Sequence, residues 1–270
     1  MTRVEGSPVD VTRHGGETHD DDEGRVPQRR RRRWPVRIAL GLLAAYVAWA
    51  LFGAWSRFGQ FDPELGSAAR EYAGNQLSPA EYPWYFPTLT LHVMTASVAL
   101  ALVFFQMWPW LRRTHPRVHR SVGRIYIFAG VYPAVISALV VQVFWPFSVA
   151  TMFSQVVPLL LWFSVTTYGY VLRRRGHVEE HRRWMLRSFG LTCLVLVELA
   201  IDPLIQLAIY TQFHTRLESN RDIYLQVKDS TENWVGLMLV ILVVEGFLEY
   251  ERIRSARRQP SAASRESTVR

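Results

Sequence analysis

Six long apolar stretches constrain this chain more than any other feature. They cover residues 35–55, 87–110, 125–146, 150–172, 188–211 and 234–250. An apolar helix of about 20 residues spans the hydrocarbon core of a bilayer, which is about 30 Å thick. Five of the stretches reach that length, whereas the last is shorter and contains Glu245. The pattern predicts an all-α, polytopic integral membrane protein, built as a six-transmembrane-helix bundle.

The two ends of the chain have a different composition from its centre. Residues 1–33 contain many Gly, Asp, Thr and Arg residues, and residues 253–270 consist largely of Ser, Ala and Arg. Segments with so few apolar residues do not bury enough surface to fold, so we expect two disordered tails. Residues 34–252 then form one transmembrane domain. The mean hydropathy of +0.03 is low because the polar tails dilute this very apolar centre.

Basic residues lie mostly on one side of the predicted spans. When the connecting segments are assigned alternately to two sides of a bilayer, 26 of the 31 Arg and Lys residues fall on one side. That side holds both tails and the loops 111–124 and 173–187. Cytoplasmic loops carry the excess of Lys and Arg in membrane proteins. We therefore expect a multi-pass protein of the cell membrane with both termini in the cytoplasm.

The net charge of +8 does not indicate nucleic-acid binding. The charge lies directly beside apolar spans, where anionic lipid headgroups attract it. The bilayer and its headgroups are thus the expected partners, and no nucleic acid is expected. Cys193 is the single cysteine, which excludes a disulfide framework and a cysteine metal site. The arginines that we expect at the membrane interface are Arg112, Arg113, Arg120, Arg124, Arg182, Arg183 and Arg187.

Two pairs of histidines lie in the basic loops, each at a spacing of four residues. They are His115 with His119, and His177 with His181. Residues at this spacing share one face of a helix. His119 and His181 each begin a predicted span on the same side, so they are candidates to hold a b-type haem or a quinone. The alternative is an interfacial role, in which the imidazoles bond to headgroups or helix ends. No metal site is predicted.

A second group of polar residues lies inside the predicted spans towards the opposite side. It comprises His92, Glu198, Asp202 and Gln206, the last three at a spacing of four residues on one helix face. Ionisable groups within a membrane usually face the bundle interior and mark functional sites. We expect a polar pocket in which His92 pairs with Asp202. The alternative is that the two acids are protonated carboxyls bonded to neighbouring helices.

Four strings of residues carry a resemblance to a known family. They are the helix around His92 with its Ala-Leu-Ala segment, His115-Pro-Arg-Val-His119-Arg-Ser-Val-Gly-Arg-Ile-Tyr, Leu-Trp162-Phe-Ser-Val-Thr166-Thr-Tyr, and His181-Arg-Arg-Trp-Met-Leu-Arg187-Ser-Phe. Through them the chain resembles the bacterial DUF2306 family of predicted membrane proteins over about residues 86–205. The resemblance implies a membrane fold and no particular activity.

Three functions are consistent with these residues. The first is a non-catalytic membrane component that binds lipid or another protein. The second is a redox protein that holds haem or quinone between His119 and His181. The third is a proton-coupled transporter that uses His92, Glu198 and Asp202. Whether the protein is an enzyme, and whether it binds any cofactor, stays open at this point.

Overall fold

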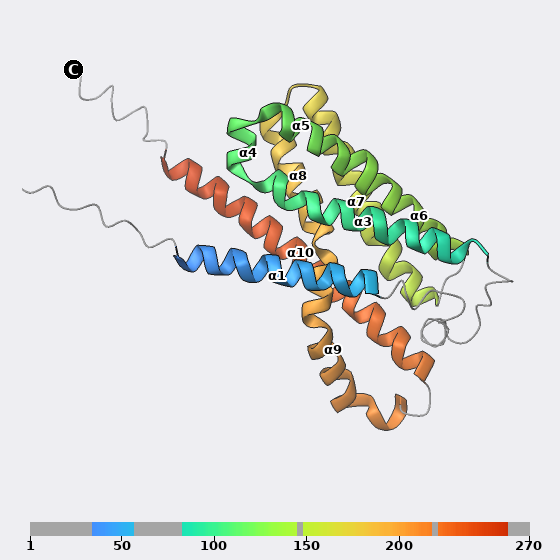
Figure 1. Ribbon diagram of the computed structural model, residues 1–270. Coiled ribbons are helices and arrows are strands. Elements are labelled where there is room, and N and C mark those ends of the chain that lie inside the picture. The colour runs from blue at the N-terminus through green and yellow to red at the C-terminus, as the bar shows by residue number, and fades with distance from the viewer. Residues whose placement is uncertain (1–33, 57–82, 145–147, 218–220, 259–270) are drawn as a thin grey trace, which may run out of the picture. The chain divides into compact units, whose positions relative to one another are not determined.

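The structure is a computed structural model that describes residues 34–56, 83–144, 148–217 and 221–258 (Figure 1). The regular elements in these ranges are all helices. They are α1 (Trp34–Ser56), α3 (Tyr85–Met107), α4 (Pro109–Thr114), α5 (Pro116–Ile125), the π-helix η2 (Tyr126–Val131), α6 (Tyr132–Phe144), α7 (Val149–Arg174), α8 (Val178–Thr192), α9 (Leu194–Leu217) and α10 (Arg221–Arg258). The chain divides into two units at Leu42. The described part of the first unit is only the beginning of α1; the bundle belongs to the second.

The predicted all-α polytopic membrane fold is confirmed. Five described helical segments are long and apolar enough to cross a bilayer: Pro87–Met107, Pro116–Phe144, Val149–Arg174, Leu194–Gln212 and Ile223–Arg257. The remaining predicted span, residues 35–55, corresponds to α1, in which the described apolar part is the shorter segment Gly41–Gly53. The predicted disordered tail 1–33 lies outside the described residues.

The basic segment 111–124, predicted as a loop, is helical. Pro109 begins α4 and Pro116 begins α5, each at the first helical turn, where proline has no backbone bond to lose. From Pro116 the chain continues through η2 and α6 to Phe144 as one span of 29 residues. His119 therefore lies inside the first turns of a spanning helix, and the third predicted span begins earlier than residue 125.

The fifth predicted span, residues 188–211, is interrupted. The chain turns after α7 at Gly176, whose φ of +88° is accessible to glycine without strain. It then returns along α7 as α8, which ends at Thr192. Cys193 interrupts the helix there, and α9 starts at Leu194. Glu198 consequently lies near the beginning of α9, close to the middle of the bundle.

The last helix is much longer than the sequence pattern predicts. Its apolar stretch, residues 234–250, is the central part of α10, which has 38 residues. Polar residues before it and after it continue the helix, because α10 packs against α7, α8 and α9 along its length. The tail predicted to be disordered from residue 253 is thus helical as far as Arg258; the residues beyond it lie outside the described residues.

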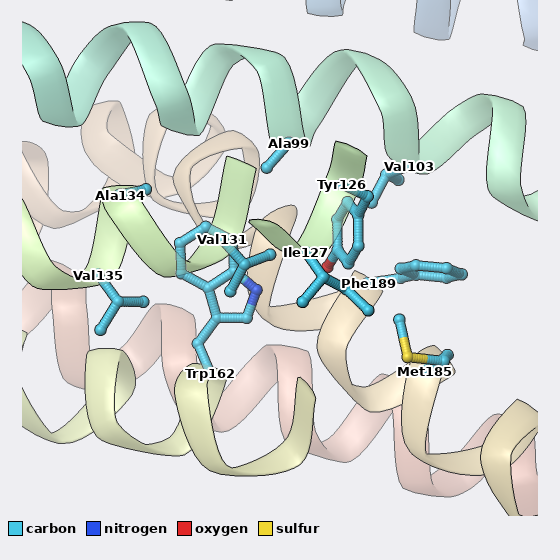
Figure 2. Close-up of a cluster of buried hydrophobic side chains, with 10 residues drawn as sticks. All are labelled: Ala99, Val103, Tyr126, Ile127, Val131, Ala134, Val135, Trp162, Met185 and Phe189. Carbon is cyan, nitrogen blue, oxygen red and sulfur yellow. The ribbon is translucent and has the colours of Figure 1, made fainter. Parts of the chain in front are cut away.

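The core lies where η2 passes between α3, α7 and α8. Figure 2 shows its buried side chains, which include Val103, Tyr126, Trp162 and Phe189. At Gly130 a Cβ atom would lie 3.1 Å from the Cα atom of Ala99 and 3.0 Å from its Cβ atom. Glycine therefore lets η2 and α3 approach closely. The π-helical stretch places Tyr126 fully inside the bundle, where it contacts Phe189 edge to face.

Candidate functional site

A cavity of about 390 Å³ lies among α3, α6, α7, α8, α9, α10 and the C-terminal half of α1. Most of its wall is apolar and includes Leu100, Leu159 and Val195. A smaller set of polar side chains also lines it: His92, Ser97, Gln155, Thr192, Glu198 and Asn233. An apolar cavity with a few convergent polar groups is the usual form of a small-molecule site.

The polar side chains of the cavity are held in place from outside it. His92 donates a hydrogen bond from Nδ1 to the carbonyl of Ala134 at 2.8 Å. This leaves Nε2 as an acceptor in the neutral ring. The amide of Gln155 accepts a hydrogen bond from Gln142. Asn233 donates to the hydroxyl of Ser154 at 3.1 Å.

Glu198 reaches the cavity because the helix opposite it carries glycine. A Cβ atom at Gly236 of α10 would lie 3.0 Å from Cγ of Glu198. Any larger residue at that position would displace the carboxyl group. The carboxyl therefore lies between α9 and α10 and lines the same cavity as His92.

A buried hydrogen-bond network lies beside the cavity and shares Trp162 and Thr192 with its wall. The Tyr126 hydroxyl lies 2.7 Å from the hydroxyls of both Ser188 and Thr192. Trp162 donates to the Thr192 hydroxyl at 3.1 Å, and the Thr166 hydroxyl lies 2.6 Å from that of Ser188. The network joins η2, α7 and α8, which gives this wall a fixed geometry.

The expected pairing of His92 with Asp202 is wrong. Asp202 instead forms an ion pair with Lys228 at 2.7 Å and accepts a hydrogen bond from Gln206 at 2.7 Å. Lys228 also pairs with Glu232 at 2.9 Å. Lys228 precedes the last apolar stretch, residues 234–250, but α10 already includes it, so the cation lies beside Asp202.

The part of the bundle that crosses the hydrocarbon core forms an apolar belt. The ion cluster of Asp202, Lys228 and Glu232 marks one boundary of this belt. At the other end of α10, Glu251 accepts two hydrogen bonds from Arg182. A rise of about 1.5 Å per residue places Lys228 about 34 Å from Glu251 along the helix. This distance is close to the thickness of the hydrocarbon core. Asp202 is therefore near the edge of the belt, and it is Glu198 that shares the layer of His92.

The end of the bundle that carries the arginine-rich segments 111–124 and 173–187 is its basic end. At this end His119 and His181 are neighbours. His181 donates from Nδ1 to the carbonyl of Gly169 at 2.7 Å, which leaves its Nε2 free. Burial, and secondarily the charge of Arg173, lower the pKa of His181, against the opposing effect of that hydrogen bond. The charges of Arg112, His181 and Arg173 all act on His119.

The other histidines of these segments have local partners. The ring of His115 lies against Trp110, and its Nδ1 is 2.7 Å from the Thr114 hydroxyl. His177 is exposed and lies 3.4 Å from Glu180. Neither approaches the pair formed by His119 and His181 closely enough to bond with it.

The predicted interface arginines divide into two groups. Arg182 and Arg187 are held by α10, since Arg182 pairs with Glu251 and Arg187 with Glu245 at 2.6 Å. Arg187 also lies over the Trp184 ring. The exposed arginines are Arg112, Arg113, Arg120 and Arg124, and Arg183 is half-buried.

Several site residues were not identified from the sequence. Asn233 lies in a polar stretch of the sequence, which does not indicate that its side chain lines a cavity. Lys228, the single lysine, entered only the total of the basic residues. Tyr126, Trp162, Thr166 and Ser188 stand in the strings that carry the family resemblance, but their polar atoms meet only in the folded bundle.

The fold defines a polytopic helical membrane protein, and the comparisons with known proteins agree. Residues 89–218 match the family DUF2306, described as a predicted membrane protein, so the resemblance seen in the sequence is confirmed. No curated protein and no solved structure matches the chain.

Proposed function

We propose that this protein is a membrane component that binds a small amphipathic molecule in the cavity beside His92 and Glu198. The observation that carries this proposal is the cavity itself, about 390 Å³ in volume, with an apolar wall and a few fixed polar groups. Its volume falls within the range of about 300–1,000 Å³ found for small-molecule sites.

The wall indicates the chemistry of the ligand. His92 offers an acceptor at Nε2, Asn233 and Gln155 offer amide groups, and Glu198 offers a carboxyl oxygen. These groups suit a hydroxyl, amide or quinone-like head. The apolar remainder of the wall suits a hydrocarbon or ring portion. A lipid-like molecule with a compact polar head combines the two.

The experiment fills the cavity from α3. Ala96 lines the cavity, so Ala96→Phe places a ring in the ligand volume. Val98, on the same helix, is 39% exposed and does not line the cavity, so Val98→Phe is the matched control. The readout is native mass spectrometry of the detergent-solubilised protein, which detects retained small molecules directly.

We expect the unaltered protein and Val98→Phe to retain the same small molecule, and Ala96→Phe to lose it. The Glu198→Gln variant keeps the shape of the cavity and alters only the head-binding group, so it should weaken retention. If no small molecule accompanies the unaltered protein, or if Ala96→Phe retains it equally, the proposal fails.

We also propose that the basic end of the bundle faces the cytoplasm of a bacterial cell. The excess of arginine in both tails and in residues 111–124 and 173–187 supports this orientation. Reporter fusions after Arg120 and Arg182 should then report a cytoplasmic position, and fusions within residues 60–80 an exterior one. The reverse pattern would overturn this orientation.

The haem and transporter hypotheses stay predictions. The described cavity lies around His92, not between His119 and His181. The absorbance spectrum of protein produced with ample haem supply tests the haem hypothesis. Proton-coupled uptake by reconstituted vesicles tests the transporter hypothesis.

A further inference from the structure

Four basic side chains converge at the end of the bundle opposite the cavity. Gly169 of α7 accepts the hydrogen bond of His181, and Arg173 lies one helical turn further along the same face of α7. Arg173 therefore lies on the side of α7 that His181 faces, and its charge acts on both His181 and His119. Arg112 approaches His119 from α4. The cluster thus combines residues from α4, α5, α7 and α8.

No carboxylate of the described residues balances this cluster. The charges that act on His119 include those of Arg112 and Arg173, and the charge of Arg173 also acts on His181. The acids at the start of α8 are engaged elsewhere, because Glu179 pairs with Arg182 and Glu180 lies beside His177. Within the ranges that the structure describes, Arg112 and Arg173 take part in no ion pair.

One buried polar atom in the cluster lacks a partner. Nδ1 of His119 is inaccessible to solvent and forms no hydrogen bond with the described residues. The backbone carbonyl of His119 is held by Gln106 at 3.1 Å, which fixes the start of α5 against the end of α3. A buried polar group without a partner costs about 1–3 kcal/mol. The buried Nδ1 gives no bond to a ligand at the surface, so Nε2 is the ring nitrogen of His119 that can donate one.

We propose that His119, His181, Arg112 and Arg173 form a binding site for a phosphate-type anion. Guanidinium groups bind phosphate oxygens through two parallel hydrogen bonds. Imidazoles that carry a proton on the free nitrogen donate a further bond each. The half-buried histidines form the floor of the site, and the exposed arginines form its rim. The anion is the phosphate of a lipid headgroup or a free phosphate, since both present the same oxygens.

The test compares two double variants of equal charge. Arg112→Gln with Arg173→Gln removes the two site arginines, whereas Arg113→Gln with Arg175→Gln removes two exposed neighbours. The full-length protein is studied in detergent by its thermal unfolding midpoint. One arm adds inorganic phosphate, with chloride at equal ionic strength as reference. The other adds phosphatidylglycerol, with phosphatidylcholine as reference.

We expect the anion to raise the unfolding midpoint of the unaltered protein and of the Arg113/Arg175 variant. The Arg112/Arg173 variant should bind the anion about a hundredfold more weakly, because each of the two lost charge-assisted bonds accounts for about tenfold. A response to phosphatidylglycerol alone identifies a headgroup site, and a response to inorganic phosphate identifies a site for the free anion. Should the Arg112/Arg173 variant fail to fold, His119→Gln compared with His115→Gln provides the same comparison.

Three results would overturn the proposal. Neither anion stabilises the unaltered protein beyond its reference. The two double variants lose the response equally, which would show a general effect of surface charge. The purified protein carries a haem absorbance band that His119→Gln abolishes, which would assign the imidazoles to iron. None of these outcomes affects the cavity at His92, because that cavity is tested by the retention of a small molecule.

Discussion

The hydroxyl of Tyr126 lies 2.7 Å from the hydroxyl of Ser188, although 62 positions separate the two residues in the chain. Both side chains are completely buried. The contact joins η2 to α8, and Thr192 extends it. The π-helical stretch and the helix that breaks at Cys193 are therefore linked by hydrogen bonds as well as by packing.

Removal of this hydroxyl should destabilise the bundle. Tyr126→Phe keeps the ring and removes both hydrogen bonds, so the free energy of unfolding should fall by about 1–3 kcal/mol. Tyr132→Phe is the control, because the Tyr132 hydroxyl is half-buried and has a longer contact of 3.1 Å with Thr167. Denaturation in mixed micelles measures the free energy of unfolding of both variants. Equal effects of the two substitutions would contradict a special role for the buried network.

Gly130 should not tolerate a side chain. Gly130→Ala places a methyl group against the backbone of Ala99, at 3.1 Å from its Cα atom, and backbone cannot move aside as a flexible side chain can. We expect a loss of about 1–3 kcal/mol in the free energy of unfolding. Gly246→Ala is the control, since nothing lies within 4 Å of its added methyl group. The free energy of unfolding of this control variant should stay the same or rise by up to about 1 kcal/mol. An equal loss of stability in both variants would refute the close contact at Gly130.

Lys228 pairs with three carboxylates at the edge of the apolar belt, closely with Asp202 and Glu232 and at 3.6 Å with Asp229. Lys228→Met leaves Asp202 and Glu232 facing each other without their shared cation. We expect the free energy of unfolding to fall by up to about 3 kcal/mol. This is the lower end of the range for breaking a buried ion pair, because these side chains are 13–28% exposed. Adding Asp202→Asn should recover part of that loss. Arg252→Met, at a pair that is 71% and 56% exposed, should change unfolding little. No recovery in the double variant would argue against this pairing.

The stability of the protein should fall in mild acid because of His181. Its pKa in the folded protein is lowered by burial and then by Arg173, whereas the unfolded chain has a histidine pKa of about 6.5. The contribution of the neutral ring is therefore complete above about pH 6.5 and is lost as the pH falls towards the folded pKa. Unfolding midpoints in phosphate-free buffer should decrease over this window. His181→Gln should flatten the decrease, and an unchanged profile would contradict this assignment.

Parts of the fold follow directly from the order of residues. Apolar length predicts a membrane protein because the hydrocarbon core requires about 20 apolar residues per span. It locates the end of a helix poorly where polar residues continue it, as in α10, since packing against neighbouring helices then replaces apolar content as the stabilising factor. The sequence pattern also did not predict the break in the helix at Cys193, because the residues around it remain apolar.

Sequence alone determined that this chain spans a membrane and which end of the helix bundle is basic. It also determined which polar residues lie within apolar stretches. It identified His92 and Glu198 because single polar residues are conspicuous in an apolar helix, and His119 and His181 because each begins a predicted span on the same side. Only the tertiary structure decided their partners: Asp202 bonds to Lys228, and His92 to a backbone carbonyl. The physical reason is that depth in a bilayer follows from position along one helix, whereas a hydrogen bond depends on the rotation and register of two.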